Sequence, residues 1–572
     1  MKRYSTKLRA AALASTLFAA MLSATACMPS SNNNLPETEV VAPILYSPKL
    51  TENRMIYKDD KADSIAHLYI TVTDSNLTAE EPIEWAELNR ISLAAPSGEA
   101  KKMDIILQEG DQEGPRAGML GFGSIYPNAV ISLRGKSTLK APQKSYKVDL
   151  SKNSGKWREQ QTVNLIKHAY DFSRIRNKLS FDYFKTIPDF TSLRTQFVNL
   201  HVKDLTNGSI STEFADYGLY TQIEQPNKSF LRAHGLDPYG HLYKAANFEF
   251  LRYPDKLKLA TDPTFDEAAF DSVLEPKGDT NHTKLLQMLD DLNNLSLDAD
   301  QVFDRYFDRD NFLTWMAVNI LMDNMDTITQ NYMLYSPLNS EKFYFLPWDY
   351  DGGWGFHEQY GEEPNSRADW QTGLSNFWGS ILQKRFFKNP ANVEDLTKKI
   401  SDLTEIINPD NTREMIESYK EIVKPFIQRQ PDIEYLPGPV SAYEAELERI
   451  IGLTAVNEKR YLANLEKPMP IFLGEVKQAG RELTFNWDMS YDLQGDELSY
   501  SFQLAKEPSF LKPLASQKNL QTTSLTLKDI AKGRYYWRVV VSDSKGNEMK
   551  AFDSYEDENN NDYHGIRQFF VE

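Results

Sequence analysis

The sequence predicts an α+β protein with a two-lobed body, rich first in strands and then in helices, and a β-sandwich at its C-terminal end. Three observations lead to this fold class. Residues from about 45 to 150 show the alternation of apolar and polar side chains that is typical of strands. Between about 283 and 326, apolar residues recur every three or four positions, which indicates helices. After Pro468 the strand pattern returns, interrupted by Gly, Asp and Asn turns.

The individual elements of the body follow from the same periodicities. The dipeptide Asn207-Gly208 separates two strand candidates and is a frequent hairpin turn. Strands are predicted at residues 67–73, 129–134, 196–202 and 217–224, and helices at residues 174–185, 283–326, 393–430 and 441–466. Strands followed by helices indicate two lobes of one α+β body. With 572 residues the chain is too long for a single hydrophobic core, so more than one domain is expected.

Residues 467–572 are predicted to form the β-sandwich, and they resemble a fibronectin type III or related immunoglobulin-like module. Its alternating strands are expected at residues 483–487, 498–504 and 534–541. Each strand contributes one aromatic side chain that is expected to be buried, namely Trp487, Tyr500 and Trp537. The Asn-rich, acidic residues 553–562 are expected to form a solvated surface loop, with calcium binding through their oxygens as the alternative.

The N-terminal 26 residues have the organisation of an export signal. Four cations precede an apolar stretch from residue 10 to 24 that is too short to span a bilayer. Small residues then lead into Cys27, the only cysteine of the chain, as in the lipobox of bacterial lipoproteins, although Ala24 stands where that motif usually carries leucine. We therefore expect a signal peptide at residues 1–26, a lipid on Cys27, a flexible tether at residues 27–45, and a membrane-anchored location outside the cytoplasm. The alternative is a plain secretory signal followed by an incidental cysteine.

The charge balance of the chain argues against one class of partner. Lys and Arg number 64 while Asp and Glu number 81, which gives a formal net charge of −17. Affinity for a nucleic-acid backbone depends on clustered cations, because they replace the counterions of the phosphates. We therefore expect no nucleic-acid partner.

Two acidic segments are the strongest candidates for chemistry. The first follows an apolar helix and contains Asp326 and Asn331, which begin and end a D-x-x-x-x-N sequence. The second follows a strand and contains Asp349 and Asp351 within a Trp-Asp-Tyr-Asp sequence. Carboxylate and amide oxygens at the ends of two strands suit Mg²⁺ or Mn²⁺. The alternative is that these aspartates only cap helices and turns.

The spacing of the acids indicates phosphoryl transfer. Kinases use an aspartate to receive the proton of the substrate hydroxyl, an asparagine five residues later, and a further aspartate to hold the metal ions. Asp349 lies 23 positions after Asp326, and Asn331 has the required spacing. The sequence therefore predicts a metal-dependent phosphotransfer site.

Cations for a phosphate group are predicted in residues 133–150. A strand ends there at Arg134, a polar loop follows, and a second strand contains Lys144 and Lys147. Cations beside a glycine-containing turn suit phosphate binding. For each of them, a solvated charge on an edge strand is the alternative.

Taken in order, these segments resemble the spore coat protein H (CotH) kinase family, whose members are atypical relatives of the protein kinase fold. The resemblance extends over most of residues 60–455. It is carried by RGKST and KSYKVDL within residues 134–150, YDFSRIRNKL at 170–179, FVNLH at 197–201, YGLYTQIEQ at 217–225, LYK at 242–244, the Asp326 segment, and PWDYD at 347–351. It implies an atypical protein-kinase-like core at residues 46–466, with a strand-rich lobe to about residue 225 and a helix-rich lobe after it.

The resemblance also implies roles for the acidic residues. Asp326 would orient a Ser or Thr hydroxyl of the substrate and accept its proton. Asn331 and Asp349 would be ligands of Mg²⁺ or Mn²⁺, and Asp351 an additional or alternative ligand. The chain departs from ordinary kinases in having no HRD or DFG sequence.

The nucleotide contacts are likewise implied by the resemblance. Lys147, or else Lys144, would contact the α- and β-phosphates of ATP, with Arg134 nearby. Glu224 and Gln225 would lie beside the adenine. The chain has no GxGxxG loop, and no helix glutamate can be identified as the partner of the lysine.

These inferences together predict a surface-anchored CotH-like protein kinase that transfers the γ-phosphoryl group of ATP to Ser or Thr hydroxyls of a secreted or surface, coat-like protein. The sandwich would position the kinase against a partner or the cell wall. The main alternative is a catalytically inactive surface adhesin or scaffold on the same fold, because little ATP is present outside the cell. A metal-dependent glycosyltransferase or hydrolase is a further alternative, since Trp-Asp-Tyr-Asp is also a D-x-D sequence, but no Gly-rich βαβ unit supports it.

Overall fold

The computed structural model describes residues 50–94, 100–208, 213–361 and 367–572. The predicted signal peptide, the lipid on Cys27 and the tether to residue 45 lie outside these residues. Among the helices that are described, none combines the length and the apolar character needed to cross a membrane.

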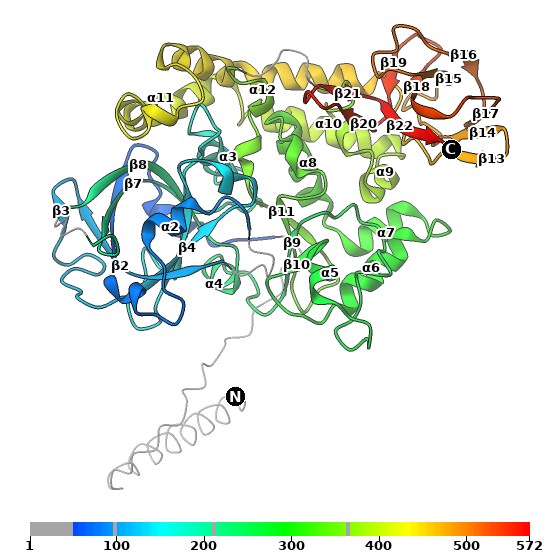
Figure 1. The fold of residues 1–572 in the computed structure, drawn as a ribbon. Coiled ribbons are helices and arrows are strands. Elements are labelled where there is room, and N and C mark those ends of the chain that lie inside the picture. Colours follow the sequence, from blue (N-terminus) through cyan, green and yellow to red (C-terminus); the bar gives the residue numbers. More distant parts are fainter. Residues whose placement is uncertain (1–49, 95–99, 209–212, 362–366) are drawn as a thin grey trace, which may run out of the picture. The chain divides into compact units, whose positions relative to one another are not determined.

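The strand-rich lobe is a sheet that closes on itself (Figure 1). Its strands are β1 (Ile65–Val72), β2 (Lys102–Asp111), β3 (Gly114–Pro115), β4 (Ala129–Arg134), β5 (Ser145–Leu150), β6 (Thr162–Ile166), β7 (Thr195–Asp204) and β8 (Ala215–Ile223). They are ordered β1-β7-β8-β6-β5-β4-β2-β3, and β1 also pairs with β2, so the sheet forms a barrel that β3 extends. Closure pairs strands that would otherwise expose unpaired backbone groups.

The barrel encloses its own hydrophobic core, which explains the alternation in the sequence. Leu68, Ile131, Val148, Val163 and Leu200 are fully buried there, each from a different strand. The predicted strands at 67–73, 129–134, 196–202 and 217–224 are confirmed as β1, β4, β7 and β8. A short helix, α2 (Trp85–Arg90), covers the barrel, and Nε1 of Trp85 donates a 2.8 Å hydrogen bond to the Tyr217 hydroxyl.

The second lobe combines helices with a four-stranded antiparallel sheet ordered β10-β9-β11-β12. The strands are β9 (His241–Ala245), β10 (Leu274–Pro276), β11 (Tyr332–Ser336) and β12 (Tyr344–Pro347). The helices are α3 (Arg176–Phe184), α4 (Lys228–Ala233), α5 (Glu267–Asp271), α6 (Thr283–Asn293), α7 (Ala299–Tyr306), α8 (Arg309–Leu321), α9 (Ile381–Phe386), α10 (Pro390–Thr404), α11 (Pro409–Ile427) and α12 (Tyr443–Leu465).

Two helices of this lobe begin at recognisable sequence signals. Helix α8 is apolar on all sides and is buried along most of its length, with Asp308 capping its first turn by accepting the Asn311 N–H. The single helical region predicted at 393–430 is two helices. The second, α11, begins at Pro409 after the cap residue Asn408, as proline at the first helical position permits.

One helix of the N-terminal half belongs to the core of the second lobe. Helix α3 precedes residue 225 in the sequence, yet Leu179, Phe181 and Phe184 are buried in the same core as α8 and α12. Its first residue, Arg176, is fully buried and forms ion pairs with Asp171 and with Glu446 of α12. The helix therefore fastens the end of the barrel segment to the helical lobe.

The C-terminal part consists of two packed sheets. One is ordered β13-β14-β17, with strands β13 (Lys477–Ala479), β14 (Glu482–Asn486) and β17 (Ser524–Lys528). The other contains β15 (Ser499–Ala505), β16 (Ala515–Leu520), β18 (Gly533–Ser542), β19 (Glu548–Lys550) and β22 (Ile566–Val571). The predicted aromatic residues Trp487, Tyr500 and Trp537 are buried between the sheets, as expected.

The acidic segment 553–562 is mostly exposed, as predicted, but it is more regular than a loop. Its ends form a two-stranded hairpin, β20 (Ser554–Glu556) and β21 (Asp562–His564), rather than an irregular loop. The turn between them is held by the Asp557 carboxylate, which accepts the N–H groups of Asn559 and Asn561 at 2.9 Å. Local side-chain hydrogen bonds of this kind are difficult to distinguish from a solvated loop by composition alone.

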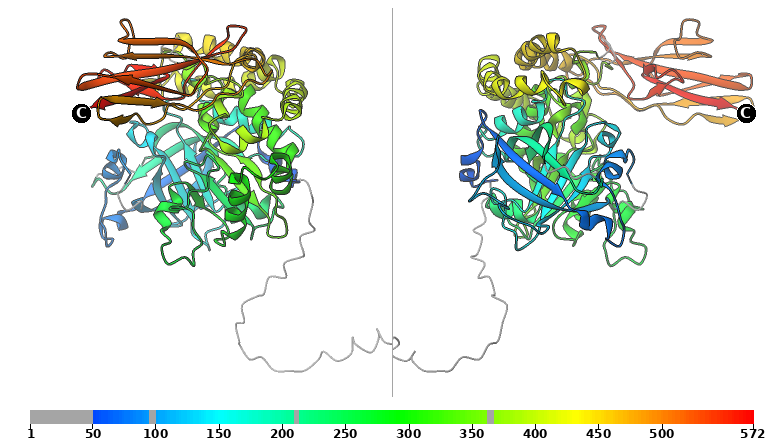
Figure 2. Two further views of the ribbon diagram at one scale, coloured as in Figure 1. Left: turned by 90° about the vertical axis from the view of Figure 1, so that its right-hand side faces the viewer. Right: turned by 60° about the vertical axis from the view of Figure 1, so that its left-hand side comes forward.

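The sandwich packs against the helices of the second lobe (Figure 2). The ring of Tyr491 stacks on Trp378 with centroids 5.7 Å apart, and its hydroxyl donates a 3.0 Å hydrogen bond to the Lys388 carbonyl. Phe552 meets Trp370 edge to face at 5.1 Å. This contact gives the sandwich a defined junction with the helical lobe.

Candidate functional site

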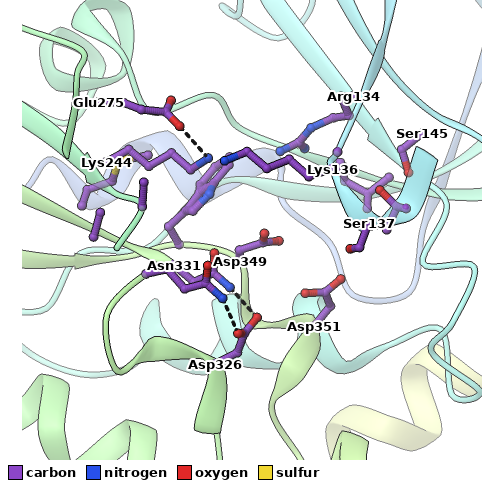
Figure 3. A pocket seen from close by; sticks show the side chains of 18 of the residues that line it. Arg134, Lys136, Ser137, Ser145, Lys244, Glu275, Asp326, Asn331, Asp349 and Asp351 are labelled. Carbon is purple, nitrogen blue, oxygen red and sulfur yellow. Dashed lines mark hydrogen bonds and ion pairs between the residues drawn. The ribbon is translucent and has the colours of Figure 1, made fainter. Parts of the chain in front are cut away.

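A pocket of about 480 Å³ lies where the β4–β5 loop of the barrel faces strands β9, β11 and β12 of the second lobe (Figure 3). Its volume is within the range of about 300–1,000 Å³ that is common for small-molecule sites. The acidic residues come from the second lobe, and most of the cations come from the barrel or from β9. The pocket thus joins opposite charges from segments far apart in the sequence.

Asp326 and Asn331 lie together at one side of the pocket. Asp326 is in a short 3-10 turn after α8, and Asn331 is the residue before β11. Nδ2 of Asn331 donates a 2.6 Å hydrogen bond to Oδ2 of Asp326, and Nε2 of Gln330 donates one of the same length to Oδ1. Burial raises the pKa of Asp326 above its ordinary value, and the charge of Asp351 adds to this effect.

Asp349 reaches the same place because of the sheet register. Tyr332 pairs with Pro347 in the antiparallel β11–β12 ladder, so the start of β11 and the end of β12 lie at the same end of the sheet. Burial and the neighbouring charge of Asp351 raise the pKa of Asp349 to about 7, although Arg134 opposes them. Within the described part of the chain, the Asp349 carboxylate has no hydrogen-bond or ion-pair partner.

The backbone is left-handed at three residues that line the pocket. The φ angles are 59° at both Asn331 and Asp349, and 51° at His168. Such conformations are unfavourable for residues other than glycine and gather at functional sites. Gly352 lies close to Asp326, and a Cβ on it would approach Cβ of Asp326 at 3.2 Å, so a small residue is needed beside the carboxylate.

Cations lie opposite the acids. Arg134, at the end of β4, packs over the ring of Trp348 with its Cζ 5.4 Å from the centroid. Burial lowers the pKa of Arg134, and Asp349 and Asp351 oppose that effect. Lys136 follows in the exposed β4–β5 loop, and Lys244 projects from β9 (Figure 3).

Six of the residues predicted from the sequence line this pocket: Arg134, Gln225, Asp326, Asn331, Asp349 and Asp351. Lys144, Lys147 and Glu224 are not among the lining residues. Nζ of Lys147 pairs with Asp149 at 2.9 Å, while the buried Lys144 donates a 2.5 Å hydrogen bond to the Leu139 carbonyl. Glu224 is buried in ion pairs with Arg194 and His234. All the predicted metal and proton ligands therefore line one pocket, but of the predicted nucleotide contacts only Arg134 and Gln225 do so.

Other charged or polar residues of the pocket were not assigned a role from the sequence, among them Lys136, His168, Lys244 and Glu275. Lys136 directly follows the Arg134-Gly135 turn, so its position beside a phosphate-binding candidate was a usable signal. Lys244 and Glu275 form an ion pair at 3.6 Å because β9 and β10 align them, and no sequence pattern reveals that pairing. His168 is buried, and neither ring nitrogen has a hydrogen-bond partner among the described residues.

A strand-rich lobe facing a helical lobe, with acids and cations meeting in the pocket between them, defines a kinase-like protein. The chain belongs to the CotH kinase family: the model of the CotH kinase protein family matches residues 131–459, more than half of its length. A curated relative is the inner spore coat protein H of Bacillus subtilis (strain 168). It is 22% identical over 338 residues, which cover 58% of this chain and 85% of that protein.

Solved structures with a likeness to the chain are more remote. The Helicobacter pylori proinflammatory kinase CtkA is 10% identical, with 55% of this chain and 91% of that chain covered at a TM-score of 0.22. The fibronectin type-III domain of human fibronectin type III domain containing protein 3 is 19% identical, with 18% of this chain and 86% of that chain covered at a TM-score of 0.14.

Proposed function

We propose that this member of the CotH kinase family is an exported, lipid-anchored protein kinase that transfers the γ-phosphoryl group of ATP to Ser or Thr hydroxyls of a secreted or surface protein. One observation carries the proposal: the pocket combines Asp326, Asn331 and Asp349 in one place with cations opposite them. Acids for metal and proton, together with cations for phosphate oxygens, are what phosphoryl transfer requires.

Asp326 is proposed as the residue that receives the proton of the substrate hydroxyl. The hydrogen bonds from Asn331 and Gln330 fix the orientation of its carboxylate. Its raised pKa strengthens it as a base at neutral pH, because the ideal base has a pKa near the working pH. Asp326 lines the pocket from the turn between α8 and β11, so a substrate side chain that enters the pocket meets its carboxylate.

Asn331, Asp349 and Asp351 are proposed to hold Mg²⁺ or Mn²⁺. The donor set fits such an ion, since it consists of oxygens only and the Asp349 carboxylate has no other partner among the described residues. A bound divalent ion would neutralise charge on the β- and γ-phosphates. The raised pKa of Asp349 is consistent with a carboxylate arranged for a cation rather than for solvent.

For the phosphates of ATP we propose Arg134, Lys136 and Lys244 in place of Lys144 and Lys147. The three proposed cations line the pocket, whereas Lys144 and Lys147 have the other partners described above. Glu275 lies beside Lys244 and also forms a 2.9 Å ion pair with Lys277. Gln225 remains the proposed contact at the adenine end.

The proposed organisation of the whole chain is a signal peptide at 1–26, an anchor at Cys27 with a tether to residue 45, a kinase domain at 46–466 and a fibronectin type III-like module at 467–572. The name of the curated relative, a spore coat protein, supports a coat-like surface protein as the substrate.

The test is transfer of radiolabelled γ-phosphate from ATP with Mn²⁺ or Mg²⁺, measured as autophosphorylation and on added proteins. Asp326→Ala and Asp349→Ala should abolish the signal while thermal unfolding shows a folded chain. The exposed Asp255 does not line the pocket, so Asp255→Asn is the matched control and should retain transfer. If wild type transfers no more phosphate than Asp326→Ala, and ATP with Mn²⁺ does not raise the melting temperature, the scaffold function replaces the kinase.

A further inference from the structure

Three carboxylates of the sandwich meet at its junction with the helical lobe. Asp492 and Asp496 belong to the loop before β15, and Asp543 belongs to the loop between β18 and β19. One oxygen from each residue lies within 4.8 Å of the other two. Asp492 and Asp543 are each only 6% exposed, so the group is largely withdrawn from solvent.

One oxygen of this group is buried without a partner. Oδ1 of Asp492 accepts the N–H groups of Gln494 and Asp496, each at 2.9 Å. Oδ2 of the same carboxylate is buried and has no hydrogen-bond partner among the described residues. A buried carboxylate oxygen without a partner is unfavourable, so a bound cation at this position would stabilise it.

Asp543 is fixed in the complementary position. Its Oδ1 accepts the N–H groups of Lys545 and Asn547, and its Oδ2 accepts Nδ2 of Asn547 at 2.7 Å. These hydrogen bonds from the loop between β18 and β19 hold the Asp543 carboxylate in place.

The charges of the group do not balance. Nζ of Lys545 pairs with Asp496 at 2.8 Å and is the one cation of the described residues that forms an ion pair with the three carboxylates. Lys545 is half exposed, and the charge of Glu466 also acts on it. Two of the three carboxylates therefore have no ionic partner among the described residues, and one divalent cation would supply it.

We propose that Asp492, Asp496 and Asp543 form a calcium site. Carboxylate oxygens are hard ligands that Ca²⁺ accepts in irregular geometry, with backbone carbonyls or water completing its shell of six to eight oxygens. Mg²⁺ demands a near-ideal octahedron, which three carboxylates from two irregular loops provide less readily. Calcium sites of extracellular modules commonly have dissociation constants of about 10⁻⁴–10⁻³ M, which is consistent with the export proposed above.

The site would fasten the sandwich to the last helix of the kinase domain. Nε2 of Gln494 donates a 3.0 Å hydrogen bond to the Leu465 carbonyl at the end of α12. Nδ2 of Asn547 donates a 2.9 Å hydrogen bond to the Glu466 carbonyl. Each loop of the site thus also holds the end of α12, so a cation that joins the two loops stabilises the junction between the sandwich and the helical lobe.

The test is calcium binding and thermal unfolding of the full chain. Isothermal titration with CaCl₂ should show one site in wild type, and about 1 mM Ca²⁺ should raise the melting temperature. Asp492→Asn and Asp543→Asn should lose both effects. Asp496→Asn is a second variant at a less buried position and should weaken binding at least tenfold even if the other two variants fold poorly.

Two controls separate this site from other acids. Asp562→Asn removes an exposed carboxylate of the same module and should keep the calcium effect. Asp349→Asn removes a carboxylate of the proposed kinase site and should also keep it, so loss of phosphate transfer and loss of calcium binding are distinguishable. The proposal is overturned by wild type that binds no Ca²⁺, by loss of binding in Asp562→Asn or Asp349→Asn, or by an equal stabilisation with Mg²⁺.

Discussion

Nδ2 of Asn331 donates its 2.6 Å hydrogen bond to Oδ2 of Asp326 from a residue whose backbone is left-handed, with φ 59°. The left-handed turn directs the side chain back toward the preceding segment instead of along β11. Asparagine tolerates this conformation better than most residues because of its short polar side chain. The hydrogen bond and the backbone conformation together fix the position of the Asp326 carboxylate.

Replacing Asn331 by glycine tests this relationship without adding backbone strain. Glycine adopts a positive φ without penalty, so we expect Asn331→Gly to unfold at nearly the wild-type temperature. Removal of the amide should reduce the rate of phosphate transfer by about 10²–10³-fold, since a proton acceptor and a metal position are disturbed together. Initial rates and thermal unfolding measured on one preparation check both parts, and a rate within twofold of wild type would contradict the proposed role.

The acids of this site were predictable from the sequence, because spacing in the chain carries the information. Asp326 and Asn331 lie in one turn directly before β11, and Asp349 follows the end of β12. The antiparallel pairing of these two strands therefore brings the three residues together. The cations were predictable only in part, since the partners of Lys147 and Lys244 depend on sheet register. The closure of the barrel by β1 and β2 also follows from long-range pairing that no local pattern reveals.

Binding of Mn²⁺ should release a proton near neutral pH. In the metal-free protein, burial and Asp351 raise the pKa of Asp349 to about 7, so this carboxylate is partly protonated there and must ionise to bind a cation. The affinity for Mn²⁺ should fall as the pH is lowered through about 7. Titration calorimetry in buffers of different ionisation enthalpy measures the released proton. The release should disappear in Asp349→Asn, and binding independent of pH between about 6 and 8 would contradict the assignment.

The buried His234 should make the stability of the chain depend on pH. His234 bridges Glu52 at 2.9 Å and Glu224 at 3.0 Å. Burial opposes its protonation, but the two carboxylates raise its pKa above the ordinary 6.5. Burial likewise acts to raise the pKa of Glu224, but His234 and Arg194 lower it to about 2 from 4.5.

The stabilisation from His234 is complete below about pH 6.5 and is lost as the pH rises through the raised pKa of the imidazole. The stabilisation from Glu224 is complete above about pH 4.5 and is lost as the pH falls toward 2. We therefore expect the largest difference in free energy of unfolding between wild type and His234→Gln from about pH 4.5 to 6.5. At that maximum the difference should be about 3 kcal/mol, because buried carboxylates lose their partner. Urea unfolding across this range checks the prediction, and a difference that does not change with pH would refute it.

The choice between the two sets of phosphate-binding cations can be decided by three alanine variants. Lys136 and Lys244 line the pocket, whereas Lys147 pairs with Asp149 at the surface. We expect Lys136→Ala and Lys244→Ala each to weaken ATP binding about tenfold, which corresponds to about 1.4 kcal/mol. Lys147→Ala should change ATP affinity and stability little, since exposed ion pairs contribute about 0–1 kcal/mol. Calorimetry with a non-hydrolysable ATP analogue and Mn²⁺ measures the affinities, and the reverse order would restore Lys147 as the phosphate contact.

The β4–β5 loop should depend on Gly135 for its shape. Gly135 has φ 97°, and a Cβ at this position would lie 1.9 Å from Oγ1 of Thr138, which cannot be accommodated without moving the loop. Because Lys136, Ser137 and Thr138 all line the pocket, Gly135→Ala should weaken ATP binding at least fivefold, equivalent to about 1 kcal/mol.

Gly123 is the matched control, since its φ is 73° but a Cβ there would meet nothing within 4 Å. Gly123→Ala therefore carries similar backbone strain without the collision, and it should lower stability by about 1 kcal/mol while leaving ATP affinity unchanged. Equal ATP affinities of the two variants would show that the collision at Thr138 does not shape the pocket.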